Sequence, residues 1–187
     1  MAEFDYPPFY AYPPYFTLQP VLATREKQLA SWKELVLKFC QHHGVCELSA
    51  DDHADGTVDV LADADKPLFY NRGINRGLQR EAKVAVIDAL AADGHAEWLG
   101  AEKRRARVLF KRLDEYAGDV KRWVDDNALS GTVYTLYEIA ESPDVPSDLR
   151  RLDRSVLARV FEHASSRGVC AVFSLDGGAG DVGVKLL

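Results

Sequence analysis

Apolar residues recur three or four positions apart in several stretches of the chain, the spacing that places side chains on one face of an α-helix. The predicted helices span residues 24–43, 80–94, 116–127 and 153–168. Thr24 and Asp153 are candidate N-caps, because their side chains can accept a hydrogen bond from a free backbone N–H. Gly44 and Gly94 stand where the first two helices should end, since glycine readily adopts the left-handed conformation of a helix terminus.

Shorter apolar runs between polar turns predict two β-hairpins. HAEWLG and the segment ending in RARVLF form one hairpin around a turn at 100–105. VCAVFSL and VGVKLL form the other around the glycine-rich turn 176–181. The weaker signals predict short helices within 67–78 and 133–141, and loops at 49–66 and 142–151.

The two halves of the chain can be aligned on each other. Gly94 then matches Gly168 and Trp98 matches Val172, which fixes the offset at 74 residues. Each half reads as three helices, a glycine, a strand, a turn and a second strand, the order of a winged helix. The sequence therefore predicts an α+β fold of two tandem winged-helix domains, 21–113 and 114–187, preceded by an extended Pro/aromatic N-terminal arm at 1–20.

Composition narrows the class of protein. The 187 residues are 47% hydrophobic, carry a formal net charge of −6 and include three cysteines. A sparse, odd set of cysteines is typical of reduced thiols rather than of a disulfide framework. No apolar run approaches the roughly 18 residues of a membrane span, and Glu3 and Asp5 stand where a secretory signal would be basic. We therefore expect a cytoplasmic globular protein.

A winged helix often binds DNA, so nucleic acid is the first partner to weigh. The compact basic patch of the sequence is Lys103-Arg104-Arg105 with Arg107, on and beside a predicted hairpin turn. The third helix of each half mixes basic with acidic residues, and the net negative charge disfavours phosphate binding. A DNA-binding winged-helix transcription regulator is the alternative function, and we expect no nucleic acid as the main partner.

Several motifs imitate ligand sites but have the wrong spacing. The acidic stretch 51–59 resembles the start of a calcium loop, yet Ala62 stands where a bidentate Glu is needed. The Cys and His residues within 40–46 do not have the spacing of a zinc knuckle, and Cys40 lies on the apolar face of a predicted helix. No helix follows the turn 176–181 to hold a phosphate. With no catalytic constellation either, we expect no enzyme, no metal and no cofactor.

The strongest signal is the N-terminal stretch DYPPFYAYPPYFTLQP, which interleaves aromatic residues with two proline pairs. It contains two Pro-Pro-x-aromatic motifs, Pro7-Pro8-Phe9-Tyr10 and Pro13-Pro14-Tyr15-Phe16. Proline pairs favour polyproline II, in which motifs six residues apart face the same way, about 19 Å from each other. We therefore predict that these residues bind the groove of a partner. Two alternatives stay open: the arm packs along its own first domain, or PPFY is a WW-domain ligand.

Six segments follow one another in chain order: PPFYAYPPYFTLQP, TREKQLASW, PLFYNRGINRGL, AEWL, VYTLYEI and GVKLL. Together they resemble the small-subunit family of ESCRT-II, the second endosomal sorting complex required for transport. The resemblance covers almost the whole chain, and it departs from the family at the acidic loop 49–66 and at the turn 176–181, where insertions are tolerated.

The resemblance implies a non-enzymatic adaptor. In the family, the N-terminal motifs dock on the two larger subunits of a heterotetramer that contains two copies of the small subunit. The second winged helix, here 114–187, recruits the ESCRT-III subunit that nucleates filaments on endosomal membranes, so that ubiquitinated cargo is sorted to multivesicular bodies. Carried over to this chain, the residues that would hold the larger subunits are Pro7, Pro8, Tyr10, Pro13, Pro14 and Phe16.

Overall fold

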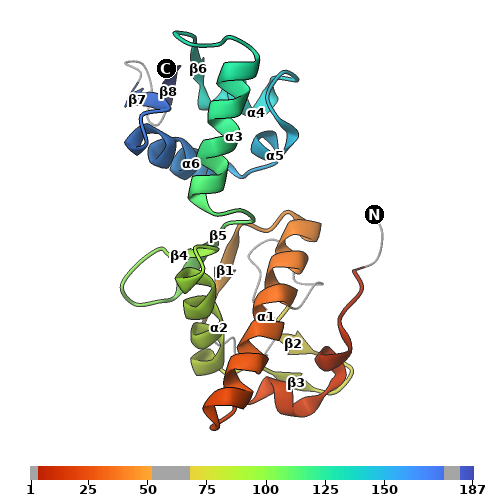
Figure 1. The fold of residues 1–187 in the computed structure, drawn as a ribbon. Helices are drawn as coiled ribbons and strands as arrows, with labels where there is room; N and C mark the ends of the chain where they lie inside the picture. Colours follow the sequence, from red (N-terminus) through yellow and green to blue (C-terminus); the bar gives the residue numbers. More distant parts are fainter. Residues whose placement is uncertain (1–3, 52–67, 175–181) are drawn as a thin grey trace. The chain divides into compact units, whose positions relative to one another are not determined.

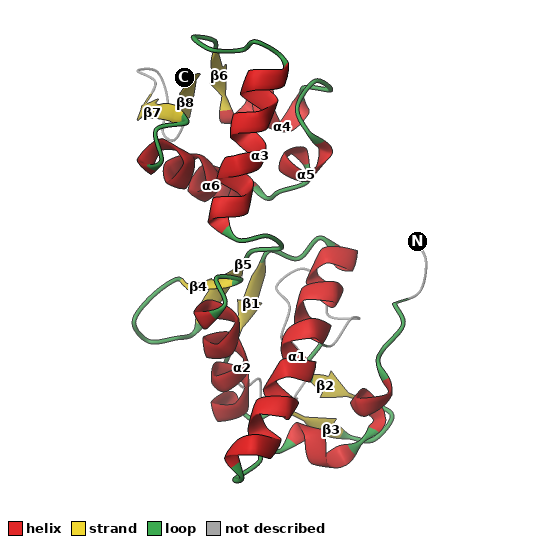
Figure 2. Ribbon diagram, in the orientation of Figure 1, coloured by secondary structure: helices red, strands yellow, loops and turns green. Residues whose placement is uncertain are grey.

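The computed structural model describes residues 4–51, 68–174 and 182–187. The chain divides into two compact units, 1–110 and 111–187, each with its own helices and its own three-stranded sheet (Figures 1 and 2). The boundary expected after residue 113 falls just inside the helix that opens the second unit.

The first unit combines an N-terminal segment with a winged helix. Its elements are the 3-10 turns η1 (Pro8–Ala11) and η2 (Pro13–Phe16), the helices α1 (Leu22–His43) and α2 (Arg80–Ala92), and the strands β1 (Glu47–Ser49), β2 (Tyr70–Asn71), β3 (Arg76–Gly77), β4 (Ala96–Trp98) and β5 (Arg105–Val108). The sheet has the order β1-β5-β4, while β2 and β3 form a separate hairpin. Both helices turn their apolar faces inward, with Trp32, Phe39 and Ile87 fully buried. This burial is the main source of the unit's stability.

Two expectations for the first unit are wrong. Helix α1 begins at Leu22, before Thr24, and no side chain caps its first turn. The short helix expected within 67–78 is instead the β2–β3 hairpin. The physical reason is an Asx turn, in which the Asn71 side chain accepts a hydrogen bond of 2.8 Å from the backbone N–H of Gly73. Asn75 then adopts a φ of +51°, which a right-handed helix does not allow.

The second unit is a winged helix without an added segment. Its elements are the helices α3 (Leu113–Asp126), α4 (Leu136–Glu141), α5 (Ser147–Arg150) and α6 (Arg154–Ser166), and the strands β6 (Val133–Thr135), β7 (Cys170–Ser174) and β8 (Val182–Leu186), in the sheet order β6-β8-β7. The helix expected over 133–141 starts only at Leu136, because Thr135 caps it and the preceding residues pair with β8. The loop expected at 142–151 contains the short helix α5.

The predicted repeat is present in the structure. Helices α2 and α6 have the same length and begin at Arg80 and Arg154, 13 residues each. After them, Gly94 and Gly168 adopt φ values of +78° and +73°, in the region that side chains with a Cβ disfavour. The fold class is therefore confirmed as two tandem winged helices after a Pro/aromatic segment. The calcium-like stretch and the turn 176–181 lie outside the residues that the structure describes, apart from Asp51.

Candidate partner-docking surface

The N-terminal arm is folded into two tight turns, and the expected polyproline II conformation is wrong. The backbone N–H of Tyr10 donates to Pro7 O at 2.9 Å, and that of Thr17 to Pro14 O at 3.3 Å. These bonds close η1 and η2, each of which has a proline in its first turn. Polyproline II has no internal hydrogen bonds, so the arm is more compact than predicted and its two motifs do not form a stiff rod.

The last ring of each motif is buried in the chain's own core. Tyr10 and Phe16 pack against Trp32 of α1, with ring centroids 6.1 and 5.3 Å from the indole. The two rings also contact each other, at 5.5 Å between centroids. The arm therefore packs along its own first domain, which was the alternative left open by the sequence. The rings that we expected to enter a partner's groove are covered by this chain.

Polar side chains hold the arm in place on α1. Gln28 is buried, and its Nε2 donates to Tyr15 O at 2.9 Å and to Thr17 O at 2.8 Å. Trp32 Nε1 donates to the same Tyr15 carbonyl at 2.9 Å. Gln28 Oε1 in turn accepts from the backbone N–H of Gln19 at 3.1 Å. A buried amide and indole with all of these partners fix the position of η2 on the helix.

The β2–β3 hairpin holds the first motif. The Tyr10 hydroxyl donates to Tyr70 O at 3.0 Å, and Asn71 Nδ2 donates to Tyr10 O at 2.6 Å. These contacts join two segments that lie far apart in the sequence. They place η1 beside the hairpin that follows the acidic region, which the sequence did not indicate.

The predicted site residues therefore separate into three classes of exposure. The rings of Tyr10 and Phe16 are buried. Phe9, Tyr15 and Pro7 are half-buried. The residues that remain exposed are Pro8, Pro13 and Pro14, together with Tyr12 between the motifs, which is 57% exposed. Of the eight predicted residues, the structure thus exposes three prolines and buries the last ring of each motif.

Each proline pair lines a cleft beside the β2–β3 hairpin. The first cleft has a volume of about 520 Å³, and Pro7, Pro8 and Tyr10 face residues 70–73 across it. The second has a volume of about 530 Å³, and Pro13, Pro14 and Phe16 face the hairpin residues 75–77 and Gln79. The repeated motif is therefore matched by a repeated surface feature.

Sequence reasoning missed the residues that support the arm. Gln28 lies one helical turn before Trp32, on the apolar face of α1. A polar residue in an apolar stripe is a signal that a backbone carbonyl needs a partner there. No comparable signal identified Tyr70 or Asn71, whose roles depend on the long-range position of the hairpin.

The basic patch of the first unit is neutralised by carboxylates. Lys103 Nζ lies 2.7 Å from Asp88 Oδ1, and Arg104 Nε lies 3.0 Å from Glu102 Oε2. Arg105 pairs with Glu47, and Arg107 Nη1 lies 3.5 Å from Glu97 Oε2. The neighbouring carboxylates lower the net positive charge of the patch, which disfavours the DNA-binding alternative.

Two of the three cysteines, Cys40 and Cys170, are buried thiols. Burial raises the pKa of the Cys40 thiol, with Cys46 adding to the shift. Burial also raises the pKa of Cys170 to about 11. Both thiols are thus protonated at neutral pH, whereas a zinc ligand must be a thiolate. Within the described ranges, no group of three or more His, Cys, Asp or Glu side chains is placed to hold a metal ion. The helices of those ranges include none long and apolar enough to cross a membrane.

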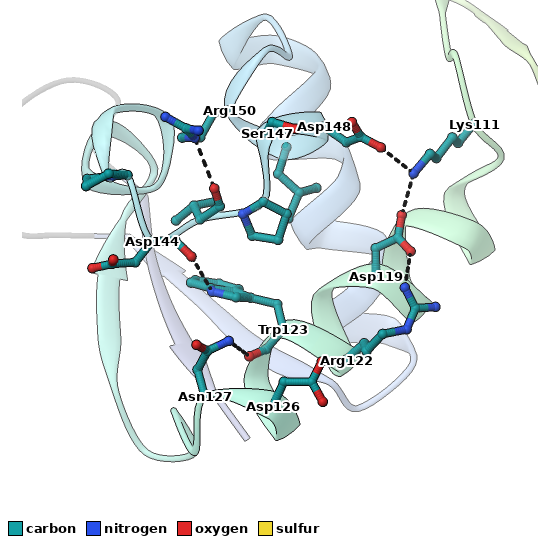
Figure 3. Close-up of a pocket in the computed structure, with 14 residues that line it drawn as sticks. Lys111, Asp119, Arg122, Trp123, Asp126, Asn127, Asp144, Ser147, Asp148 and Arg150 are labelled. Carbon is teal, nitrogen blue, oxygen red and sulfur yellow. Dashed lines mark hydrogen bonds and ion pairs between the residues drawn. The ribbon is translucent and has the colours of Figure 1, made fainter.

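A third cleft lies in the second unit, between α3 and the α4–α5 segment (Figure 3). It has a volume of about 520 Å³, and Trp123 forms part of its wall. The indole Nε1 donates to Asp144 O at 3.1 Å, and Arg150 Nε donates to Val145 O at 3.0 Å. These two hydrogen bonds, one from α3 and one from α5, hold the turn before α5 in place.

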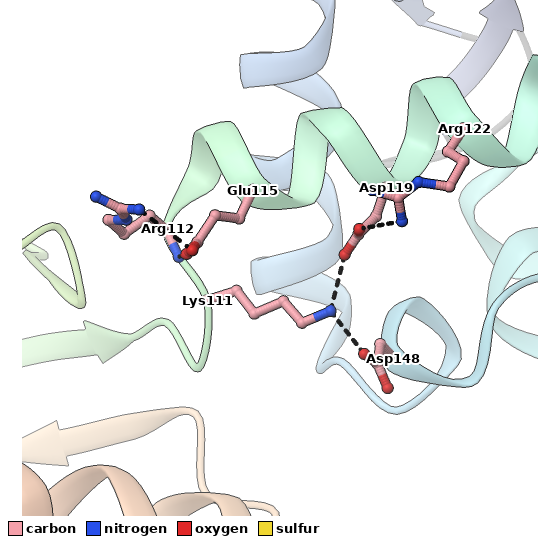
Figure 4. A network of polar contacts seen from close by, with 6 residues as sticks. All are labelled: Lys111, Arg112, Glu115, Asp119, Arg122 and Asp148. Carbon is pink, nitrogen blue, oxygen red and sulfur yellow. Dashed lines mark hydrogen bonds and ion pairs between the residues drawn. The ribbon is translucent and has the colours of Figure 1, made fainter.

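Lys111 ties α3 to α5 beside this cleft (Figure 4). Its Nζ lies 2.8 Å from Asp119 Oδ2 and 2.7 Å from Asp148 Oδ2. The hydrogen bond to Asp119 is the main cause that raises the pKa of Lys111 above its ordinary value, and the hydrogen bond to Asp148 adds to it. The Lys111 ammonium likewise holds the pKa of Asp148 below its usual range. Asp119 also accepts from Arg122 Nη1 at 3.0 Å, so the charges of this network are compensated internally.

Comparison with known proteins gives a family for the chain. A family model described as ESCRT-II complex subunit matches residues 9–153. The chain is 36% identical over 186 residues to the vacuolar protein sorting-associated protein 25 of Arabidopsis thaliana, a match that covers 99% of this chain and 97% of that protein. It is 34% identical over 179 residues to the protein of the same name from Danio rerio, covering 95% and 97%.

Solved structures agree on the fold. The chain superimposes on the crystal structure of subunit VPS25 of the endosomal trafficking complex ESCRT-II with a TM-score of 0.79 at 23% identity, covering 96% of this chain and 98% of that one. A chain of the crystal structure of endosomal complex ESCRT-II (VPS22/VPS25/VPS36) gives a TM-score of 0.76 at 23% identity, covering 97% and 98%. The chain therefore belongs to the ESCRT-II complex subunit family, in the group of vacuolar protein-sorting-associated protein 25.

Proposed function

We propose that the chain is a non-enzymatic adaptor subunit of ESCRT-II. Its first unit docks on two larger subunits through the arm, and its second winged helix, within 114–187, recruits an ESCRT-III subunit. The assembly is a heterotetramer with two copies of this chain. It acts in the cytoplasm on endosomal membranes, where it sorts ubiquitinated membrane cargo to multivesicular bodies. Family membership supports the assembly, since one similar structure is named as a complex of VPS22, VPS25 and VPS36.

The repeated clefts of the first unit carry this proposal. Both proline pairs stand at the edge of a cleft of similar volume, with the β2–β3 hairpin as the opposite wall. Exposed prolines with fixed φ lose little conformational freedom when a partner covers them. A surface of this kind is suited to holding a partner without any chemical step.

The eight motif residues have two roles in this proposal. Pro7, Pro8, Pro13 and Pro14 contact the larger subunits, with Phe9 and Tyr15 as partly exposed apolar neighbours. The rings of Tyr10 and Phe16 act as positioning residues, because their burial against Trp32 holds both turns in place. Replacing Tyr10 or Phe16 with Ala, or deleting the arm, would damage the core as well as the surface.

A cleaner experiment changes exposed prolines only. We expect the double variant Pro8→Glu, Pro14→Glu to lose co-purification with the larger subunits, because two charges would be buried without partners in the interface. Leu22→Glu is the matched control, since Leu22 is exposed and lines neither cleft. Thermal unfolding followed by circular dichroism must show that both variants are folded. A double variant that still assembles as well as the control would overturn the docking role of the prolines.

The two-copy assembly has a measurable consequence. Two second units in one complex strengthen a weak contact with a membrane-bound partner through effective concentration. A complex restricted to one copy should therefore recruit the ESCRT-III subunit to vesicles at least about tenfold less well at equal occupancy. Sedimentation of vesicles with labelled protein measures this difference, and equal recruitment by both complexes would argue against avidity.

A further inference from the structure

The cleft beside the second proline pair is electropositive. Its wall on the hairpin side contains Arg76, an exposed residue that forms no ion pair with the carboxylates of the described residues. The amides of Asn75 and Gln79 line the same wall, and the described lining residues include no Asp or Glu. In a chain with a formal net charge of −6, a cleft with one cation and two amides is suited to an anion.

Thr17 lines this cleft from the side of the arm. It directly follows η2, and η2 packs against β3, the strand that carries Arg76 (Figure 1). Thr17 is exposed, and none of the described residues forms a hydrogen bond with its hydroxyl. The structure thus places an available hydroxyl and an unpaired guanidinium on the walls of one cleft.

The backbone holds Thr17 in an ordered and extended conformation, with φ and ψ of −119° and 126°. Its N–H donates to Pro14 O at 3.3 Å, and its carbonyl accepts from Gln28 Nε2 at 2.8 Å and from Gln19 Nε2 at 2.9 Å. These bonds use the backbone groups of Thr17 and leave its side chain out. A group added to the hydroxyl therefore leaves the packing of the arm on α1 intact.

The hydroxyl groups of the arm differ in this respect. Thr17 is the only Ser or Thr of the arm. In the first cleft, the Tyr10 hydroxyl donates to Tyr70 O at 3.0 Å, and the Tyr70 hydroxyl donates to Asn75 Oδ1 at 2.7 Å. Tyr12 is exposed but lines neither cleft. Thr17 is therefore the hydroxyl residue of the arm that combines exposure with a position opposite a cation.

We infer that Thr17 is a phosphorylation site, whose phosphate binds Arg76 across the second cleft and closes this cleft to the larger subunits. The inference rests on the proposed function, in which the proline pairs bind those subunits. In the reaction, the Thr17 oxygen bonds to the γ-phosphorus of ATP while the bond from that phosphorus to the β,γ-bridging oxygen breaks. ADP leaves with the electron pair of that bond, and the hydroxyl proton passes to the catalytic base of a protein kinase.

The charge of the phosphate has two consequences. It carries about −1.5 to −2 charges at neutral pH and has three acceptor oxygens, which suit the paired N–H groups of a guanidinium. The Thr17–Arg76 pair ties the end of η2 to β3. The same phosphate stands beside Pro13 and Pro14, where a partner that covers the prolines has to bury a charged group. Phosphorylation therefore favours the unassembled chain over the complex.

The first measurement needs no partner. The full chain is produced with phosphothreonine at position 17, and the second pKa of the phosphate is followed by phosphorus NMR. Because Arg76 favours the dianion, we expect this pKa to be lower than in the Arg76→Gln variant by at least about 0.5. Arg72→Gln removes the cation of the first cleft and is the matched control, expected to leave the low pKa unchanged. A pKa that does not respond to Arg76→Gln would overturn the pairing.

The second measurement separates this inference from the proposed function. Co-purification with the larger subunits compares phosphothreonine at position 17 with phosphothreonine at position 24, where Thr24 is exposed and lines neither cleft. We expect binding to fall at least about tenfold for position 17 only. Equal assembly by both phosphorylated chains would overturn the closing of the cleft and leave the docking role of the prolines intact. No assembly by the unphosphorylated chain would overturn both.

The third measurement asks whether cells make the modification. Trypsin cuts after Arg25, so that Thr17 and Thr24 fall in one peptide and control for each other in fragmentation spectra. The chain is purified from its own cells with phosphatase inhibitors, and the pool bound to the larger subunits is separated from the unbound pool. We expect phosphate on Thr17 and enriched in the unbound pool. An unbound pool without phosphate on Thr17 would overturn the assignment.

Discussion

The two units complete their cores in different ways. The first unit takes Tyr10 and Phe16 from a segment that precedes its winged helix and packs them on Trp32. The second unit is closed by its own elements, with α3 against α6 and the sheet beneath them. The two copies of the repeat therefore differ in how their cores are completed, since the first uses an added arm and the second uses its own elements.

The largest expected effect is a loss of stability that is confined to the core of the first unit. Trp32→Ala removes the fully buried indole that joins the arm to α1. We expect the free energy of unfolding of the first unit to fall by about 4 kcal/mol, with no change in the second. Urea unfolding followed by fluorescence measures both, because Trp98 reports on the first unit and Trp123 on the second. An equal shift of both transitions would show that the cores are not independent.

A second substitution asks how much of the first core the arm supplies. Phe16→Ala should cost the first unit about 3 kcal/mol, nearly as much as a residue of the winged helix itself. Phe161→Ala in α6 is the mirror variant, and it should lower the stability of the second unit by a similar amount. Tyr12→Ala is the surface control, expected to stay within about 0.5 kcal/mol. If Phe16→Ala lowered the free energy of unfolding no more than Tyr12→Ala does, the arm would contribute nothing to the hydrophobic core.

The glycines that end helices should show where the units are alike. Gly44 and Gly168 have φ values of +67° and +73°, and a Cβ added at either would meet nothing within 4 Å. The cost of Gly44→Ala and Gly168→Ala is therefore backbone strain alone, about 1 kcal/mol for each variant in its own unit. Melting temperatures of the two variants give the comparison. A cost several times larger at one site would reveal packing that differs between the units.

The smallest expected effect concerns the Lys111 network of the second unit. The lowered pKa of Asp148 means that its pairing stabilises the second unit above the unfolded pKa, near 3.8, and is lost as the pH falls through the lower folded value. Lys111→Met should therefore cost less than about 1 kcal/mol at neutral pH, and the difference from the unchanged chain should vanish in acid. Unfolding at pH 7 and at pH 2 measures this, and an undiminished difference in acid would contradict the electrostatic origin.

The sequence predicted the long helices and their glycine ends because those features are local. Gly94 and Gly168 could be placed from helical periodicity and spacing alone. Strands β1 and β6 could not, because three residues carry no period and both strands exist only through pairing with β5 and β8. Because these two strands were not predicted, the sequence also could not show which residues share the outer face of each sheet. That assignment depends on the register of the strands.

The conformation of the arm could not be predicted for a different reason. Proline fixes φ near a value that suits both polyproline II and a 3-10 turn, so the two conformations differ mainly in ψ. Local preference therefore leaves the choice open, and the contacts with Gln28 and Trp32 decide it. The motifs marked the segment as a candidate site, while the burial of its rings depends on residues outside it.

The contact between the arm and the β2–β3 hairpin also bears on how the chain folds as it is made. Tyr10 and Tyr70, which share a hydrogen bond, are 60 residues apart. During synthesis the arm emerges first, and the hairpin that holds it leaves the ribosome much later. Contacts of such long sequence separation form slowly because a large loop must close. The nascent arm can pack its rings on Trp32 of α1 in that interval, but it lacks the two hydrogen bonds that tie η1 to the hairpin until Tyr70 and Asn71 have been made.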